Sequence, residues 1–265
     1  MSRLSQVFSK LPVNQKAFIP FITAGDSGLD NTYELMQTLV ENGADVIELG
    51  VPFSDPMADG PMIAKSHERA VADGVSLHDV LDLVKRFRQT NNTTAIVLMG
   101  YLNPIEVFGY QAFATAASNS GVDGVLVVDM PPEEASDLKQ DLDAVDIDFI
   151  FLVAPTTTND RLVSLANMAS GFVYFVSLKG VTGAGHLDVD SVNSNLNRIR
   201  QYIDLPVGVG FGIKDAATAL AVSKHADAVI VGSSLVAFVE KYAADKDKML
   251  STVGELANEI SSAIK

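Results

Sequence analysis

The 265-residue chain contains no cysteine and no tryptophan. Without cysteine it has no disulfide, no iron–sulfur ligand and no thiolate nucleophile, so sites of these kinds are excluded. The redox compartment therefore cannot be inferred from cysteine usage. The missing tryptophan carries little physical information beside 13 phenylalanines and 6 tyrosines.

Basic residues are scarce, because 19 Lys and Arg stand against 33 Asp and Glu, for a net charge of −14. A surface this acidic repels phosphate backbones and anionic lipid, so we expect neither nucleic acid nor a membrane as a partner. Long apolar runs are missing too, and none approaches the roughly 20 residues that span a bilayer. A cytoplasmic protein is the default expectation, and any anionic ligand must be held by local groups.

Linkers and internal repeats are also missing. No Ser/Gly/Pro-rich stretch or block of like charge divides the chain, which is 48% hydrophobic, so residues 1–265 are expected to form a single domain with one sizeable core. The first segment, MSRLSQVFSKL, places Leu4, Val7, Phe8 and Leu11 at helical spacing. This spacing predicts an N-terminal helix that docks on the domain.

The pattern that is present is an alternation of short β-rich runs with longer segments of helical spacing. The eight runs comprise residues 17–23, 46–50, 95–100, 124–129, 148–154, 172–177, 206–212 and 228–233. Apolar strands alternating with helices predict a parallel sheet covered by helices, and at this length a closed (β/α)8 TIM barrel fits best. An open doubly wound sheet is the alternative. No GxGxxG follows the first run, which argues against a dinucleotide-binding version.

An acid interrupts the second apolar run, VIELG. If Ile47 and Leu49 face the helices, the alternation points Glu48 into the barrel. An ionised, unpaired carboxylate there would cost several kcal/mol, and the strand runs contain no Arg or Lys to pair with it. A functional group is therefore favoured over a buried salt bridge. Asp55 and Asp59 follow in a proline-rich loop, where acids are also ordinary turn formers.

Glycines supply the other chemical signal. GVTGAG follows the sixth run, GVGFGIK contains the seventh, and VGSSLVAF carries the eighth into a helix. Glycines let backbone N–H groups approach an anion closely, and a helix N-terminus adds a favourable dipole. Because these segments coincide with three successive strands, they predict a phosphate cradle that needs no Lys or Arg.

These motifs resemble the family of tryptophan synthase α subunits. The resemblance rests on IELGVPFSDPMADG, on GVTGA, and on GFG together with GSS, and it spans the whole chain. It implies a TIM barrel with an added N-terminal helix. It also implies a carbon–carbon lyase of tryptophan biosynthesis, which cleaves indole-3-glycerol phosphate to indole and glyceraldehyde 3-phosphate by a retro-aldol reaction without metal or organic cofactor.

The resemblance implies a role for particular residues. Glu48 would be the general acid and base, and Asp59 would accept the indole N–H. The indole pocket would be formed by residues at strand ends, namely Phe21, Tyr101, Leu126, Leu152 and Tyr174. The closing loop and the phosphate site would comprise Thr182, Gly183, Phe211, Gly212, Gly232 and Ser233.

The resemblance also implies a protein partner. Members of the family meet a β subunit, a pyridoxal-phosphate enzyme that receives indole through a tunnel, in an α2β2 heterotetramer. Asp55 and Pro56 would lie at that interface. Pyridoxal phosphate is expected only on the β subunit.

Other interpretations stay open on the residues alone. A Schiff-base aldolase could use Lys179, although a solvated loop lysine is favoured because an exposed lysine keeps its ordinary pKa. A sugar-phosphate isomerase or epimerase would share the barrel and the phosphate site. A non-catalytic regulatory subunit is a further possibility, against which Glu48 and Asp59 speak. The four histidines show no metal-ligand spacing, so solvated or capping roles are expected for them.

Overall fold

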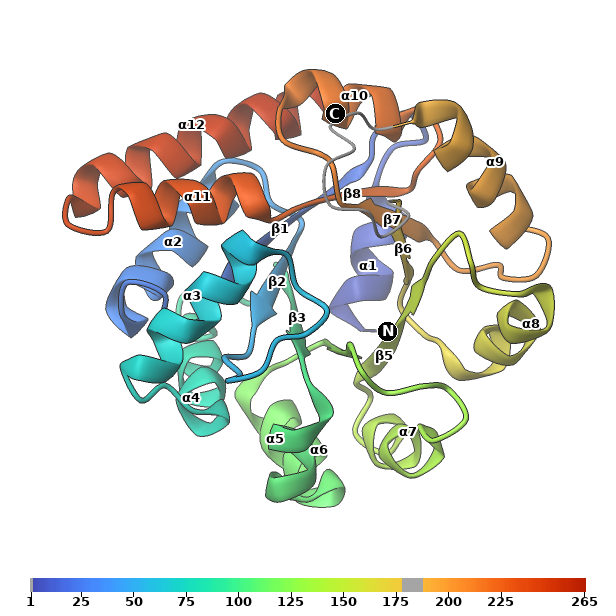
Figure 1. Ribbon diagram of the computed structural model, residues 1–265, viewed down its shortest axis with the longest axis horizontal. Helices are drawn as coiled ribbons and strands as arrows, with labels where there is room; N and C mark the ends of the chain where they lie inside the picture. Colours follow the sequence, from blue (N-terminus) through green and yellow to red (C-terminus); the bar gives the residue numbers. More distant parts are fainter. Residues whose placement is uncertain (1, 178–187) are drawn as a thin grey trace.

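A computed structural model describes residues 2–177 and 188–265. Parallel strands close into a barrel in the order β1 to β8, so the TIM barrel is confirmed and the open sheet is wrong (Figure 1). The strands are β1 (Ala17–Thr23), β2 (Val46–Gly50), β3 (Ala95–Gly100), β4 (Gly124–Val127), β5 (Asp148–Val153), β6 (Val173–Val176), β7 (Val207–Gly210) and β8 (Ala228–Val231).

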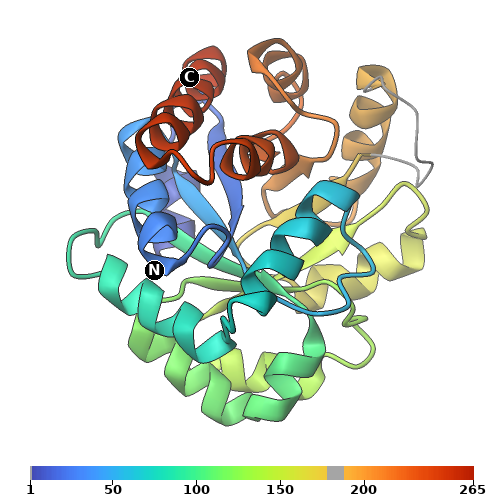
Figure 2. The same ribbon diagram turned by 60° about the vertical axis from the view of Figure 1, so that its left-hand side comes forward.

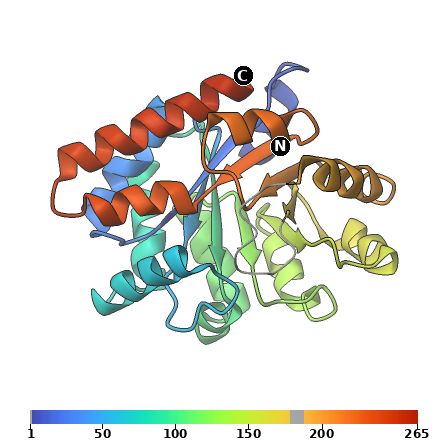
Figure 3. The same ribbon diagram turned by 45° about the horizontal axis from the view of Figure 1, so that its top comes forward.

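Helices surround the barrel. They are α1 (Arg3–Lys10), α2 (Leu29–Glu41), α3 (Pro61–Ala72), α4 (Leu77–Phe87), α5 (Leu102–Phe108), α6 (Tyr110–Ser120), α7 (Ser136–Asp143), α8 (Asn159–Met168), α9 (Val189–Ile199), α10 (Ala216–Ser223), α11 (Ser233–Lys241) and α12 (Lys246–Ile264). The C-terminal α12 packs between α10 and α2, which completes the ring (Figures 2 and 3). None of the helices in the described ranges is long and apolar enough to cross a membrane.

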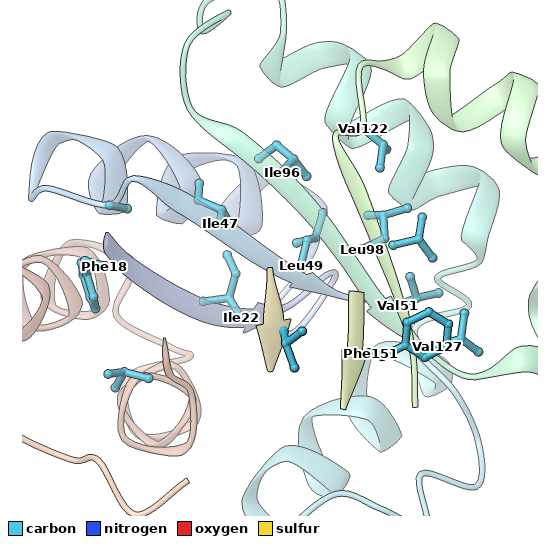
Figure 4. Packing of buried hydrophobic residues seen from close by; sticks show 14 of the residues in the cluster. Phe18, Ile22, Ile47, Leu49, Val51, Ile96, Leu98, Val122, Val127 and Phe151 are labelled. Carbon is cyan, nitrogen blue, oxygen red and sulfur yellow. The ribbon is translucent and has the colours of Figure 1, made fainter. Parts of the chain in front are cut away.

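Side chains from the strands form two apolar layers. Ile47 and Leu49 of β2 lie in the outer layer with Ile96 and Leu98 of β3, between the strands and the helices (Figure 4). Val46 lies in the inner layer, inside the barrel. Because strand side chains alternate, the same register turns Glu48 inward. The period-2 pattern of the sequence therefore predicted the two faces of this strand correctly.

The predicted N-terminal helix is confirmed as α1, which closes one end of the barrel. Leu4 is fully buried in the inner layer, and the ring of Phe8 lies 5.9 Å from that of Phe172. Arg3 donates a hydrogen bond of 2.8 Å to Asp123, whose other carboxylate oxygen accepts one of 2.7 Å from Arg88. This buried acid thus ties α1 to α4 and to the amino-terminal edge of the sheet.

Helix caps agree with the sequence in part. Asp215 caps α10 by accepting a hydrogen bond from the N–H of Thr218. The segment NDRLVSLANMAS in the sequence offers Asn159 as the cap of a helix, but that expectation is wrong, because Thr158 has the extended backbone of a cap and accepts from the N–H of Arg161. The threonine hydroxyl one residue earlier therefore begins α8.

Candidate active site

A cavity of about 590 Å³ opens at the carboxyl-terminal ends of the strands. It is lined by Glu48 of β2, Asp59 of the loop that follows, Tyr174 of β6, and the segments after β7 and β8. Active sites of this barrel fold lie at this end. A polar groove of about 800 Å³ surrounds α1 at the opposite end. The cavity that contains the carboxylates is the candidate active site.

Glu48 is the most deeply placed acid in the cavity, with 1% of its surface exposed. Neither carboxyl oxygen forms a hydrogen bond to any residue that the structure describes. Burial, helped by the negative charge of nearby Asp59, raises the pKa of Glu48 to about 8. At neutral pH the group is therefore mainly a neutral acid that can donate a proton.

Asp59 occupies the loop between β2 and α3, and its side chain is only 5% exposed. Its Oδ2 accepts a hydrogen bond of 2.8 Å from the Tyr101 hydroxyl, which in turn accepts one of 3.1 Å from the N–H of Ala58. Burial raises the pKa of Asp59, and the hydrogen bond from Tyr101 opposes this by favouring the charged form. The tyrosine therefore both orients the carboxylate and helps it stay ionised.

The residues expected in the indole pocket separate into two groups. Phe21 and Tyr174 line the cavity. Tyr101 does not line the cavity itself but donates a hydrogen bond to Asp59, which does. Leu126 and Leu152 belong to the inner apolar layer and are not among the described lining residues. Further apolar lining comes from Ile63 of α3, Met99 of β3 and Ile230 of β8.

The predicted phosphate residues Phe211, Gly212, Gly232 and Ser233 all line the same cavity. Phe211 and Gly212 have φ of 71° and 76°, so the chain turns sharply after β7. Gly232 is the N-cap of α11, and the helix begins at Ser233. The first N–H groups of a helix have no partner within it, and they form a ready anion site. Backbone groups from two neighbouring strand ends therefore meet here.

Some predicted residues lie elsewhere. Thr182 and Gly183, with Lys179, fall outside the described residues. Asp55 is exposed on the loop after β2, and Pro56 beside it is half-buried. Asp129, within the fourth β-rich run of the sequence, accepts a hydrogen bond of 2.8 Å from the N–H of Leu102 and so holds the start of α5.

Sequence reasoning missed several residues of the site. His67 is 2% exposed and its Nδ1 accepts a hydrogen bond from the N–H of Phe53, so the solvated or capping role expected for it is wrong. The signal was the spacing of Ser66, His67 and Ala70 along one face of α3.

The cavity also extends over α10, where the small side chains of Ala217, Thr218 and Ala221 line it. Ser234 contributes a buried hydroxyl without a hydrogen bond to the described residues, and Lys214 is the single cation among the described lining residues.

Comparison with known proteins places this geometry in a family. Residues 8–265 match the family model described as tryptophan synthase alpha chain. The chain belongs to the tryptophan synthase alpha chain family. A tryptophan synthase alpha chain from Ruthia magnifica subsp. Calyptogena magnifica is 76% identical over 265 residues, which cover 100% of both chains.

Solved structures agree with this assignment. The crystal structure of tryptophan synthase subunit alpha from Legionella pneumophila str. Paris is 41% identical, covers 100% of this chain and 98% of its own, and has a TM-score of 0.92. A chain of the tryptophan synthase complex from Pyrococcus furiosus is 35% identical, with coverage of 94% and 99% and a TM-score of 0.83.

Family membership settles the class of activity. Tryptophan synthase alpha chains are lyases of tryptophan biosynthesis that cleave indole-3-glycerol phosphate by a retro-aldol reaction, and this chain is one of them. The Schiff-base and sugar-phosphate alternatives therefore fall away. No group of three or more His, Cys, Asp or Glu within residues 2–177 and 188–265 is arranged to hold a metal ion.

Proposed function

We propose that this chain cleaves indole-3-glycerol phosphate with Glu48 as the proton donor and acceptor and Asp59 as the stabilising carboxylate. The observation that carries the proposal is the pairing of two buried acids in different states. Glu48 has no donor among the described residues and a pKa of about 8, whereas Asp59 accepts a hydrogen bond from Tyr101. Two acids whose environments differ in this way can take different roles, a protonated one that exchanges protons and an ionised one that stabilises positive charge.

The proposed reaction restores Glu48 to its protonated form at the end of each cycle. The neutral carboxyl of Glu48 protonates C3 of the indole, which leaves positive charge on the ring nitrogen. The resulting carboxylate removes the proton of the glycerol hydroxyl as the carbon–carbon bond breaks, which releases indole and glyceraldehyde 3-phosphate. Asp59 accepts the indole N–H and stabilises the cation as it forms.

Substrate orientation follows from the two kinds of group that line the cavity. Apolar side chains such as Tyr174, Met99 and Ile230 suit the indole ring, while the backbone at Gly212, Gly232 and Ser233 suits the phosphate. Assay of indole release from indole-3-glycerol phosphate by the purified chain tests the proposal. A chain that released no indole, alone or with its partner, would contradict it.

The phosphate site gives a first prediction. In Gly232→Val the new Cβ would be in ordinary van der Waals contact with Phe21, at 3.4 Å, and the two added methyl groups would occupy space in the cavity at the N-cap of α11, where they obstruct anion approach. We expect glycerol 3-phosphate to bind at least about tenfold more weakly, because charge-assisted hydrogen bonds to the backbone are lost. Calorimetric titration measures the change.

Lys214→Gln is the matched comparison, because Lys214 is the only cation among the described residues lining the cavity. If backbone groups hold the anion, this variant should weaken binding much less than Gly232→Val does. The reverse ranking would show that charge holds the phosphate.

We propose further that residues 1–265 act as a single barrel domain, in the cytoplasm, as the α subunit of an α2β2 assembly. No cofactor is needed on this chain, and pyridoxal phosphate belongs to the β subunit. The existence of a solved tryptophan synthase complex with a similar chain supports the partner. On this chain, the loop with Asp55 and Pro56 is the proposed contact, beside Met57, which is 80% exposed.

The same loop connects the proposed contact to the catalytic acid. The carbonyl of Pro56 accepts a hydrogen bond of 3.1 Å from the N–H of Asp59, so a shift of Pro56 moves Asp59 directly. We therefore expect the β subunit to raise turnover by ordering this loop. Asp55→Ala and Pro56→Ala should reduce the activation by about tenfold, within the usual range of coupling between sites, with a much smaller change in the basal rate.

Indole release measured with and without the β subunit checks this coupling. Asp82→Ala, on exposed surface of α4, is the control. Equal losses with and without the partner would show that the loop residues serve the chemistry itself.

A further inference from the structure

His67 is a buried histidine that the proposed reaction does not use. It projects from α3, and its side chain is 3% exposed. Its Nδ1 accepts a hydrogen bond of 3.1 Å from the N–H of Phe53. In a neutral imidazole whose Nδ1 is an acceptor, the proton resides on Nε2. His67 therefore presents an N–H on the side of the ring away from Phe53.

That side of the ring faces the catalytic loop. Nε2 of His67 lies 3.6 Å from Oδ2 of Asp59, which is longer than a hydrogen bond but within range of a charge–dipole attraction. The ring also meets Tyr101 edge-on, with centroids 6.5 Å apart at 79°. In a buried site such an attraction is stronger than in water.

His67 is neutral in this setting. Burial lowers its pKa to about 4, so the imidazole carries no charge near neutral pH. A neutral donor attracts the Asp59 carboxylate without neutralising it. His67 can therefore orient the carboxylate of Asp59 and leave its negative charge available to stabilise the indole cation.

The two oxygens of Asp59 have different surroundings. Oδ2 accepts from Tyr101 and faces His67, whereas Oδ1 forms no hydrogen bond to the described residues. The hydrogen bond from Tyr101, together with the attraction of the nearby His67 N–H, fixes the rotation of the carboxylate. The other oxygen is then left for a ligand in the cavity that Asp59 lines.

We propose that His67 is a positioning residue for catalysis, whose Nε2–H holds Oδ2 of Asp59 so that Oδ1 meets the indole nitrogen. The inference rests on the proposed role of Asp59. The competing role is structural: His67 would only anchor the loop through its contact with the N–H of Phe53.

A pair of substitutions separates the two roles. His67→Gln retains an N–H donor near the position of Nε2 but loses the acceptor for Phe53. His67→Asn retains an acceptor near the position of Nδ1 but loses the donor toward Asp59. If His67 positions Asp59, the Asn variant should be impaired and the Gln variant should keep its activity. If His67 only anchors the loop, the Gln variant should be impaired and the Asn variant should keep its activity.

For His67→Asn we expect kcat to fall about tenfold, since one interaction with a charged group is lost, with little change in KM because the interaction matters most in the transition state. The acid limb of kcat/KM should move to higher pH, because Asp59 loses a group that favours its charged form. The titratable groups that face Asp59 are Tyr101, His67, Glu48 and Tyr174, and only His67 is changed.

The measurements use the full chain, alone and mixed with the β subunit, with indole-3-glycerol phosphate as substrate. His67→Gln should stay within about threefold of wild type, the scale of a retained hydrogen bond. In an Asp59→Asn background, His67→Asn should add no further loss, because its effect acts through the carboxylate.

Each other outcome overturns the proposal. An active Asn variant with an impaired Gln variant assigns His67 to anchoring the loop. Equal impairment of both that persists in the Asp59→Asn background shows a structural role, and full activity of both shows no role. An Asp59→Asn single variant with the wild-type rate would instead refute the role of Asp59 itself, which distinguishes failure of the proposed function from failure of this inference.

Discussion

Glu48→Gln should lower the rate of indole release by about 10²- to 10⁴-fold, the usual contribution of a positioned general acid or base. Glutamine keeps the shape and the burial of the side chain but can neither give a proton to C3 nor take one from the glycerol hydroxyl. Binding of glycerol 3-phosphate should persist, because the phosphate end of the cavity is unchanged. Single-turnover assay of indole and calorimetric titration measure the two effects.

The pH dependence provides an independent check on Glu48. Since the reaction begins from the protonated acid, kcat/KM of the wild type should fall as the pH rises past about 8, the pKa to which burial raises the group. The alkaline limb should be missing from the residual activity of the Gln variant. A Gln variant with near wild-type activity, or an alkaline limb that survives the substitution, would remove Glu48 from its role.

Stability should respond to the same ionisation. Burial raises the pKa of Glu48 from 4.5 to about 8, so between these values the folded protein keeps a proton that the unfolded chain releases. The free energy of unfolding therefore falls with rising pH in this window, by about 1.4 kcal/mol per pH unit. Below the window both states are protonated and the contribution is constant.

Glu48→Gln removes this pH dependence, because the amide does not ionise. Its stability relative to wild type should rise steadily from about pH 4.5 to about pH 8, the pKa limits of the group, as measured by urea denaturation. Glu259→Gln, on the exposed face of α12, changes the same charge at the surface and serves as the control. Parallel stability curves for wild type and Glu48→Gln would show that the buried carboxyl does not retain its proton.

The barrel could be read from the sequence because its signals are local and repeated. Alternation in β2 separated Ile47 and Leu49 from Glu48 without knowledge of the partner strands. Strand ends were harder to predict. The run expected over residues 206–212 ends as a strand at Gly210, because Phe211 and Gly212 turn into the left-handed region. The run expected over residues 124–129 ends at Val127, and Asp129 lies in the turn that follows, where its carboxylate accepts a hydrogen bond from the N–H of Leu102.

The environment of the catalytic acids could not be read in the same way. Asp59 was singled out by its motif, but the hydrogen bond from Tyr101 joins the loop after β2 to the end of β3, residues 42 positions apart. His67 approaches Asp59 only because α3 docks with that face inward. Leu126 and Leu152 were expected in the indole pocket because they stand near strand ends, yet both belong to the inner apolar layer and neither is among the described residues that line the cavity. Such contacts depend on tertiary packing, which periodicity does not specify.

Asp59→Asn is expected to have the second large effect, a loss of about 10²- to 10³-fold in kcat, comparable to the removal of one group that stabilises transition-state charge. Asparagine can still accept the hydrogen bond that Tyr101 donates to Oδ2, so the loop should keep its shape. What is lost is the negative charge opposite the indole nitrogen. Asp82→Asn, on the exposed surface of α4, is the matched control for the change in net charge.

The pH profile of Asp59→Asn should change at both its acid and its alkaline limb, for a different reason at each. The acid limb should disappear, because the wild type loses activity at low pH when Asp59 takes up a proton, and asparagine has none to take up. The alkaline limb should move below its wild-type position near pH 8, because the charge of Asp59 helps to raise the pKa of Glu48. If the rate and both limbs stayed as in the wild type, Asp59 would be an ordinary loop residue. If the acid limb vanished while the alkaline limb stayed in place, the two acids would act without electrostatic coupling.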